Sequence, residues 1–247
     1  MSSIQKFYPE FDFGGYTDID GTVIFYNRVK AIMKPTDVVL DLGCGRGEYQ
    51  DDDVEFRREL RIFKNKAKSV IGLDVDPGAK ENPYLDEFLF LEGDEWPLDD
   101  SSVDLIVSDW VLEHVQNPDK YFSEARRVLR DGGRMCIRTT NKWTYFAVAA
   151  RLIPNKLHSK VTSYVQDARK EEDVFPTVYE CNTRRSVKRK MDEYQFDNVV
   201  YTFESEPRYL SFSKILYFFG VIHQKYAPGF LKPTILAFGR VSKKGIN

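Results

Sequence analysis

The ten residues from Val38 to Gly47, VVLDLGCGRG, constrain the fold more than any other part of the chain. Apart from Asp41, the first five are valine or leucine, which is typical of a buried strand. Glycine then stands at alternate positions, at Gly43, Gly45 and Gly47, so the backbone can turn sharply and approach a ligand without a Cβ in the way. A helix that begins after such a turn has unpaired N–H groups at its start. The stretch therefore predicts a strand–turn–helix unit that holds the polar end of a nucleotide-like cofactor.

Asp41 indicates which cofactor this is. Dinucleotide-binding turns carry Gly-x-Gly-x-x-Gly, whereas this turn has Gly-x-Gly-x-Gly with a carboxylate two residues before Gly43. A carboxylate there repels a pyrophosphate and attracts a cation. The string resembles motif I of the class I S-adenosylmethionine (SAM) methyltransferases, whose methyl donor carries a sulfonium and an ammonium group and no phosphate. The resemblance implies that Gly43, Gly45 and Gly47 lie against the methionine part of SAM and that Asp41 supports its ammonium group.

Strands and helices alternate along the first 140 residues, which predicts a doubly wound, parallel α/β sheet. We expect strands at 38–42, 69–74, 88–91, 103–108 and 134–140, and helices at 22–33, 49–66 and 118–129. Later we expect helices near 186–194 and 212–221 and strands at 198–203 and 234–241. The family resemblance implies that these two strands complete a seven-stranded Rossmann-like sheet whose last strand is antiparallel.

The alternation stops between residues 141 and 185, a stretch that contains Pro154 and Pro176. We therefore expect a single methyltransferase domain over 1–247, with an N-terminal helical cap at 1–36 and an insertion or lid at 141–185. Ligands of open α/β sheets bind at the carboxyl ends of the strands, so the insertion after the fifth strand would lie beside the ligand.

Further residues are assigned to the cofactor because they match other segments of the family. The second strand ends at Asp74, which the resemblance assigns to the two ribose hydroxyls, with Asp76 as the competing choice. The segment from Gly93 to Leu98, GDEWPL, resembles the family's Gly-Asp-Ala segment, so Asp94 is expected to accept a hydrogen bond from the adenine amino group and Glu95 to contact adenine through its backbone amide. Ser108, at the end of the fourth strand, is expected on the floor of the cleft.

Methyl transfer to a hydroxyl needs an in-line nucleophile and a group that takes its proton. Asp109 and His114, which follow the fourth strand, are candidate catalytic residues, and His158 is a second candidate base. Glu113-His114 resembles a pair found in many small-molecule methyltransferases, and the alternative is that the pair only supports the loop. For His158 the alternative is an ordinary surface histidine. We predict no metal site, because Trp110 occupies the position that would complete one.

Polar and aromatic residues after the fifth strand are candidates for binding the acceptor. They predict a surface that stacks on a sugar ring and bonds its hydroxyls, and the alternative for Asn182 is a helix cap. These candidates are Arg138, Asn141, Tyr145, Tyr179, Asn182 and Arg184. The resemblance implies methylation of a small molecule or glycan, at oxygen, with an RNA or protein methyltransferase or a non-catalytic SAM-binding protein as alternatives.

The amino-acid composition limits the binding partners and the cellular compartment that we expect for the protein. Lys and Arg number 36 and Asp and Glu 38, so no overall basic field favours nucleic acid. Three separated cysteines indicate neither a disulfide framework nor a zinc site and fit a reducing cytoplasm. The apolar run at 210–222 is too short to span a bilayer. For the aromatic stretch at 210–230 we favour packing on the sheet or a homodimer contact, and a membrane-surface contact stays open.

Overall fold

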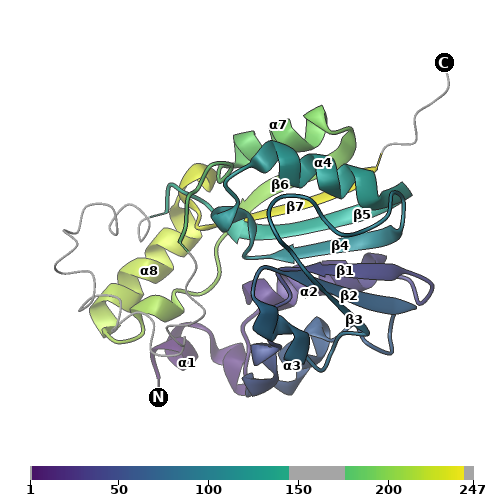
Figure 1. Cartoon of the computed structure of the whole chain (residues 1–247). Helices are drawn as coiled ribbons and strands as arrows, with labels where there is room; N and C mark the ends of the chain where they lie inside the picture. The colour runs from purple at the N-terminus through teal and green to yellow at the C-terminus, as the bar shows by residue number, and fades with distance from the viewer. Residues whose placement is uncertain (1, 145–175, 242–247) are drawn as a thin grey trace.

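The computed structural model describes residues 2–144 and 176–241 (Figure 1). Within them the chain forms a seven-stranded sheet in the order β3-β2-β1-β4-β5-β7-β6. The strands are β1 (Val38–Leu42), β2 (Ser69–Asp74), β3 (Glu87–Phe90), β4 (Val103–Asp109), β5 (Leu129–Thr140), β6 (Phe196–Phe203) and β7 (Thr234–Val241). Strands β1 to β5 pair in parallel, and β7 runs antiparallel to both β5 and β6. The predicted doubly wound sheet with an antiparallel last strand is confirmed.

The strand predictions differ from the structure mainly at β5. The sequence predicts a break at 130–133 and a strand from Arg134, whereas β5 already begins at Leu129. Leu129 pairs with Val103, and the register then shifts so that Arg134 pairs with Leu105. The intervening residues form a bulge in which Gly132 has a φ of +73°. The two glycines therefore kink the strand instead of ending it.

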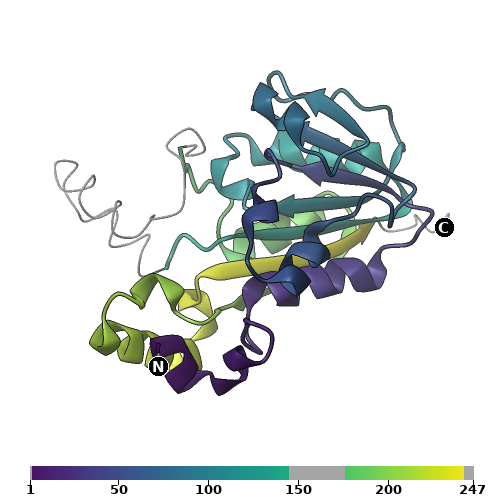
Figure 2. The same cartoon turned by 90° about the horizontal axis from the view of Figure 1, so that it is seen from below.

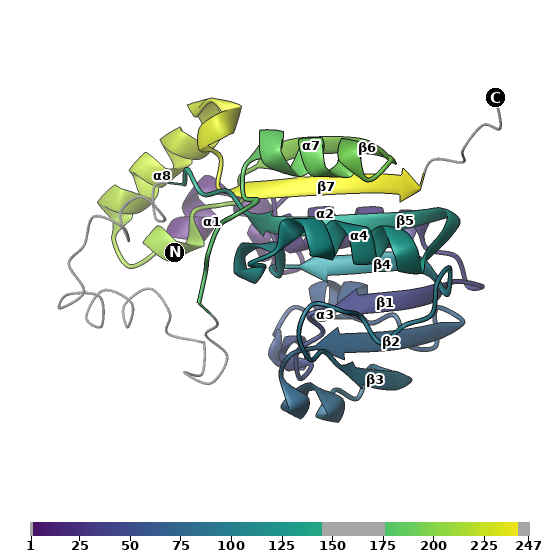
Figure 3. The same ribbon diagram turned by 45° about the horizontal axis from the view of Figure 1, so that its top comes forward.

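Helices cover both faces of the sheet (Figures 1 and 3). The longer helices are α2 (Gly21–Ile32), α3 (Glu55–Arg61), α4 (Pro118–Val128), α7 (Arg184–Glu193) and α8 (Lys214–Tyr226). The short ones are α1 (Ser3–Phe7), η1 (Pro9–Asp12), η2 (Glu48–Asp51), η3 (Pro77–Glu81), η4 (Leu112–His114), η6 (Arg208–Leu210) and η7 (Gly229–Leu231). Helices α4 and α7 lie on one face of the sheet, and α2 and α3 lie on the other. One apolar core lies on each face, because alternate side chains of the buried strands point to opposite sides.

Helix α3 is shorter than the helix predicted at 49–66. The carboxylate of Asp52 accepts hydrogen bonds from the backbone amide of Val54 at 3.0 Å and from Arg57 Nε and Nη2, both at 2.6 Å. These bonds stabilise a turn at 52–54, so the chain forms η2, turns and then begins α3. An aspartate that bonds the amide two residues later competes with helix, which explains the break.

Helices α8 and α1 lie beyond the carboxyl ends of the parallel strands (Figures 2 and 3). Tyr8, Tyr217 and Val221 form a small separate core there, packed against Ile4 and Phe7. In contrast, α2 packs on the sheet through Phe25 and Val29. The segment 1–36, expected as one cap, is therefore divided: α1 packs against α8, and α2 packs against the sheet. No helix of the described residues is long and apolar enough to cross a bilayer.

Candidate cofactor and acceptor site

The turn after β1 brings the backbone close to the loop after β4. Gly43, Gly45 and Gly47 have φ angles of +68°, +54° and +84°, which L-residues with a Cβ rarely adopt. A Cβ on Gly43 would lie 2.3 Å from Cγ2 of Val111, so this glycine is also required by space. The amide of Gly43 donates to the carbonyl of Leu73 at 2.7 Å, which ties the turn to β2.

Asn82 braces the same turn, and the sequence analysis missed it. Its Nδ2 donates to the carbonyl oxygens of Cys44 at 3.1 Å and Gly45 at 3.2 Å, and the residue is buried. These bonds satisfy backbone carbonyls that the turn leaves without a partner. In the sequence Asn82 precedes a proline and is typical of an ordinary turn, so no local pattern indicates this role.

Three carboxylates approach one another beside the glycine turn. Asp41 lies in β1, Asp74 ends β2 and Asp109 ends β4, and these strands are neighbours in the sheet. Burial, together with the negative charges of Asp109 and Asp74, raises the pKa of Asp41 to about 7. Arg138 is ion-paired with Asp109, so Asp41 and Asp74 are the two carboxylates left for a positively charged ligand.

The residues that form this arrangement also match a known family. Residues 40–137, which run from β1 into β5, match the family described as "Methyltransferase domain". Over this segment the chain is similar to SAM-dependent methyltransferases of class I. The cofactor of this family is SAM, and the carboxylates of Asp41 and Asp74 beside the turn agree with a cationic cofactor.

Two relatives illustrate how far the similarity extends. A probable SAM-dependent methyltransferase of Mycolicibacterium smegmatis is 34% identical over 114 residues, which cover 43% of this chain and 39% of that protein. The demethylmenaquinone methyltransferase of Symbiobacterium thermophilum is 24% identical over 176 residues, covering 66% of this chain and 64% of that protein. The chain spans only 30% to 48% of the length of the first curated relatives it matches.

Solved structures share the fold at low sequence identity. A putative methyltransferase of Haloferax volcanii, solved in complex with the Trm112 activator, has a TM-score of 0.59 at 16% identity, with 92% of each chain covered. Geranyl diphosphate C-methyltransferase of Streptomyces coelicolor A3(2), solved with S-adenosylhomocysteine, has a TM-score of 0.51 at 17% identity, covering 90% of this chain and 79% of that one.

Asp74 connects β2 to the glycine turn. Its Oδ2 accepts from the amide of Gly45 and its Oδ1 from the amide of Asp76, each at 2.9 Å, and burial raises its pKa. Asp76 accepts from Arg46 Nε and from the amide of Gly78, both at 2.8 Å. The hydrogen bond from Arg46 lowers the pKa of Asp76. Both aspartates therefore contact the turn, Asp74 through the backbone amide of Gly45 and Asp76 through the side chain of Arg46.

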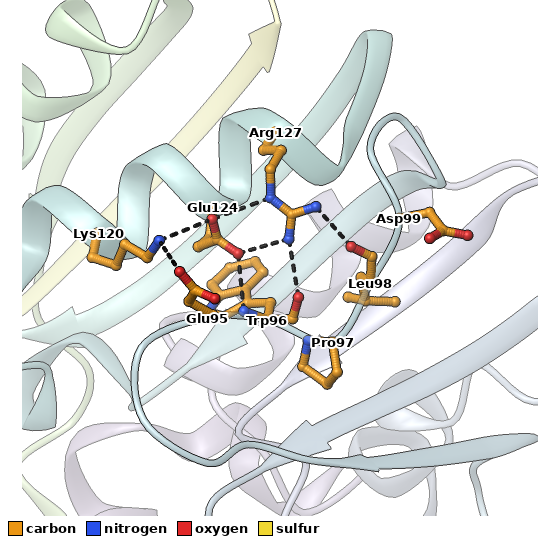
Figure 4. Close-up of a pocket in the computed structure, with 8 residues that line it drawn as sticks. All are labelled: Glu95, Trp96, Pro97, Leu98, Asp99, Lys120, Glu124 and Arg127. Atoms are coloured by element: carbon orange, nitrogen blue, oxygen red, sulfur yellow. Dashed lines mark hydrogen bonds and ion pairs between the residues drawn. The ribbon is translucent and has the colours of Figure 1, made fainter.

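The residues predicted for adenine lie on an exposed loop between β3 and β4. Asp94 is 3.4 Å from Asn117 Nδ2, and Glu95 is 3.3 Å from Lys120 Nζ. Figure 4 shows a pocket beside this loop, between the loop and α4. Its lining residues are Glu95, Trp96, Pro97, Leu98, Asp99, Lys120, Glu124 and Arg127.

The polar groups of this pocket bond to one another. Arg127 donates to the carbonyls of Leu98 at 2.7 Å and Trp96 at 3.0 Å, and it also bonds Glu124 (Figure 4). The pocket therefore fastens the loop to α4, and none of its lining residues belongs to the glycine turn. Ser108, which was expected on the cleft floor, is fully buried and accepts a hydrogen bond from Tyr121 Oη at 2.7 Å.

Asp109 and Arg138, predicted for catalysis and for acceptor binding, bond each other. Arg138 Nε lies 2.5 Å from Asp109 Oδ1, Nη2 lies 2.6 Å from Oδ2, and Tyr26 Oη also donates to Oδ2 at 2.9 Å. Arg138 is only 3% exposed, and its Nη1 donates to Thr22 at 3.0 Å. The guanidinium therefore neutralises Asp109, and this geometry favours a positioning role for Arg138 over binding of an acidic acceptor.

The Glu113-His114 pair holds together segments distant in the sequence. The buried carboxylate of Glu113 accepts from Thr139 Oγ1 at 2.8 Å and Thr140 Oγ1 at 3.1 Å, and burial raises its pKa. Its backbone carbonyl accepts from the amides of residues 178 and 179, and His114 Nδ1 lies 3.0 Å from the carbonyl of Pro176. These contacts favour the alternative in which the pair supports the loop.

Both asparagines predicted to bind the acceptor are buried and make internal hydrogen bonds. Asn141 Nδ2 donates to the carbonyls of Phe230 at 2.8 Å and Lys232 at 2.9 Å. Asn182 Nδ2 donates to Thr139 Oγ1 at 2.8 Å and to the carbonyl of Thr140 at 2.9 Å. Both side chains therefore fasten the end of β5 to other segments.

The remaining candidates for binding the acceptor have different surroundings. Tyr179 is partly buried with a φ of +55°, and Arg184 Nε donates to the carbonyl of Val200 at 3.0 Å. Tyr145 and His158 lie outside the described residues, as does most of the predicted insertion.

A further histidine at this end of the sheet was missed. His223 Nδ1 lies 2.8 Å and 3.0 Å from the two carboxylate oxygens of Glu204, which directly follows β6 and is buried. Burial raises the pKa of Glu204. The two residues are 19 positions apart in an aromatic stretch, so nothing in the sequence pattern links them.

Proposed function

We propose that this protein transfers a methyl group from SAM to a hydroxyl oxygen of a small molecule or glycan. The observation that carries the proposal is the position of Asp41 and Asp74 beside a turn built from glycines with positive φ. This combination attracts a cation and leaves the backbone open to it, and a pyrophosphate would be repelled.

The residues on the donor side have separate tasks. SAM supplies a methyl group bonded to a positively charged sulfur. Asp41 in its ionised form balances positive charge, and Asp74 presents a carboxylate that accepts hydrogen bonds from vicinal hydroxyls. Asp94 is proposed to accept from the adenine amino group, and Glu95 to contact adenine through its backbone amide. Asn82 and Val111 hold the glycine turn in the bent form that these contacts require.

On the acceptor side, a residue is needed that can take the proton of the hydroxyl group. Arg138 and Tyr26 hold both oxygens of Asp109, which makes Asp109 a weak candidate for removing a proton. His114 is the better candidate base among the described residues, because imidazole is the side chain that most often takes a proton in catalysis. Its contact with the carbonyl of Pro176 orients the ring.

The relatives support a small-molecule acceptor. The demethylmenaquinone and geranyl diphosphate methyltransferases are named for small molecules, and the formal charge of this chain is −2, which does not favour a polyanion such as RNA. The alternatives are an RNA or protein acceptor and SAM binding without turnover.

Isothermal titration tests the donor site first. We expect the wild-type protein to bind SAM and not NAD, and Asp74→Asn to weaken SAM binding by at least about tenfold, which corresponds to one lost charged hydrogen bond. Asp76→Asn is the matched comparison, since the Asp76 carboxylate is already held by Arg46 and the amide of Gly78, and this variant should bind SAM with nearly normal affinity. NAD binding in place of SAM contradicts the electrostatic argument.

Turnover is then measured with SAM labelled on its methyl group. The acceptors are low-molecular-weight phenols and quinols, polysaccharides, total RNA and a protein extract, each incubated separately. Label in the first two fractions supports the proposal, whereas label confined to RNA or protein rejects the acceptor class. Tight SAM binding without any transfer rejects the catalytic function.

A further inference from the structure

Helix α8 is apolar on both of its faces. Its inner face packs through Tyr217 and Val221, which are buried against Tyr8. Its outer face carries large exposed side chains at helical spacing: Ile215 (70% exposed), Phe218 (47%), Phe219 (60%), Ile222 (39%) and Tyr226 (79%). A surface helix of a globular domain normally presents polar residues outward, whereas the outward side chains of α8 are apolar.

The exposed apolar surface continues on both sides of the helix. Tyr209 and Phe212 precede α8 and are 59% and 60% exposed, and Phe230 follows it and is 65% exposed. Single exposed apolar residues are ordinary, but so many large ones on one helix and its flanking segments are typical of an interaction site. We call this surface, from Tyr209 to Phe230, the α8 face.

The charged residues within and directly after the α8 face are cations. Between Tyr209 and Pro233 the chain contains no aspartate or glutamate and has three lysines, Lys214, Lys225 and Lys232, whereas Arg208 just before the face is paired with Glu206 and Asp20. Phenylalanine, tyrosine, leucine and isoleucine flanked by lysine are typical of a helix that lies in the headgroup region of a membrane. A partner with negative charge above an apolar layer is complementary to this surface, and an anionic bilayer is such a partner.

The length of the helix agrees with an interfacial position. Helix α8 has 13 residues, and none of the described helices is long enough to cross a bilayer. The helix also lies at the carboxyl ends of the strands (Figure 2), and Asn141 after β5 bonds the carbonyls of Phe230 and Lys232. The α8 face therefore borders the side of the sheet where the acceptor is expected.

We propose that the α8 face binds the surface of an anionic lipid membrane, with the helix lying flat in the headgroup region. The inference concerns binding alone and does not depend on the proposed methyl transfer. Burial of the outer apolar side chains supplies the affinity, and attraction of the cations to anionic headgroups supplies the lipid preference.

Vesicle flotation of the full chain tests the proposal. We expect the protein to float with phosphatidylcholine vesicles that contain phosphatidylglycerol, and to bind pure phosphatidylcholine vesicles at least about tenfold more weakly. Ile215→Ser/Phe219→Ser should weaken binding by at least about tenfold without changing the net charge. Lys214→Gln/Lys225→Gln should weaken binding to the anionic vesicles only.

Matched controls separate the α8 face from general effects. Lys188→Gln/Arg189→Gln removes two exposed cations from α7, on the face of the sheet, and should leave flotation unchanged. Circular dichroism and melting temperatures verify that each variant is folded.

Three results overturn the proposal. They are the absence of flotation with both vesicle types, flotation that the serine variant leaves unchanged, and a wild-type dimer that becomes monomeric in the serine variant without any vesicle binding. The last result would assign the α8 face to a second copy of the chain, and light scattering after size-exclusion chromatography detects it.

Discussion

Arg138 at the end of β5 and Asp109 at the end of β4 form a two-bond ion pair, with N–O distances of 2.5 Å and 2.6 Å. The two residues are register partners in the sheet, and their side chains are only 4% and 16% exposed. Trp110, the next residue, has a φ of +59°, and its ring lies 5.1 Å from the guanidinium. The pair therefore neutralises an acid beside the donor site and fixes the loop that leads to Glu113.

Removing one member of this ion pair should destabilise the folded protein. Arg138→Met leaves the Asp109 carboxylate largely buried without its counter-charge, and we expect it to lower the free energy of unfolding by about 3 kcal/mol or more. Asp109→Asn/Arg138→Met should be less destabilising than the sum of the single variants, because neither charge is then left alone. Urea unfolding measures all three variants, and additive losses would contradict the coupling.

Gly43 should tolerate no side chain. Gly43→Ala would place a methyl group 2.3 Å from Val111 at a φ of +68°, so both a clash and backbone strain result. We expect a loss of about 3 kcal/mol in the free energy of unfolding and no measurable binding of SAM in calorimetry.

Gly93→Ala is the matched control for this variant. Gly93 has a φ of +75°, but no atom lies within 4 Å of the added Cβ, so only the strain remains. Its cost should be about 1 kcal/mol. Equal losses in the two variants would show that the contact with Val111 is unimportant.

Asp41 should make SAM binding depend on pH. Its pKa of about 7 in the free protein means that a proton must leave before the carboxylate can balance a cation. We expect SAM affinity to fall between pH 8 and pH 6, approaching about tenfold per unit at the acid end. In Asp41→Asn the affinity should be lower at pH 8, and this component of the pH dependence should disappear.

The same shift has a consequence for the stability of the free protein. The pKa of Asp41 is higher in the folded chain than in the unfolded one, so folding favours the protonated form. The stability that this group contributes is present at acid pH and is lost as the pH rises from about 4 through 7. Free Asp41→Asn should therefore melt above the wild type at pH 8 and near it at pH 4, and a lower melting temperature at pH 8 would argue against the raised pKa.

The sequence predicts the parallel sheet well because the signals that specify it are local. The bounds of β1, β2 and β7 agree with those expected, since runs of β-branched residues end at turn residues there. The glycine turn is likewise local, and its three positive φ angles follow from residues within five positions of one another.

The contacts of the polar residues at the strand ends could not be predicted from the sequence in the same way. The sequence shows that Asn141 and Arg138 stand where a ligand would lie, but it does not show what else reaches them. The partners of Asn141 are backbone carbonyls 89 and 91 residues away, and Arg138 meets Asp109 across the sheet. Asn82 and His223 were missed for the same reason, because their partners are defined by the tertiary fold.

Substitutions should show that Glu113 stabilises the fold and that His114 acts in the reaction. Glu113→Ala leaves the buried hydroxyls of Thr139 and Thr140 without their acceptor, and we expect a loss of about 2 kcal/mol in the free energy of unfolding, whereas Glu113→Gln keeps an acceptor and should lose about half as much. His114→Gln should leave stability and SAM affinity almost unchanged and lower kcat by about 100-fold if the imidazole takes the proton. Urea unfolding, calorimetry and initial rates over pH 5.5–8.5 distinguish these outcomes. A wild-type kcat in His114→Gln, with a loss of stability like that of Glu113→Ala, would assign the whole pair to support of the loop.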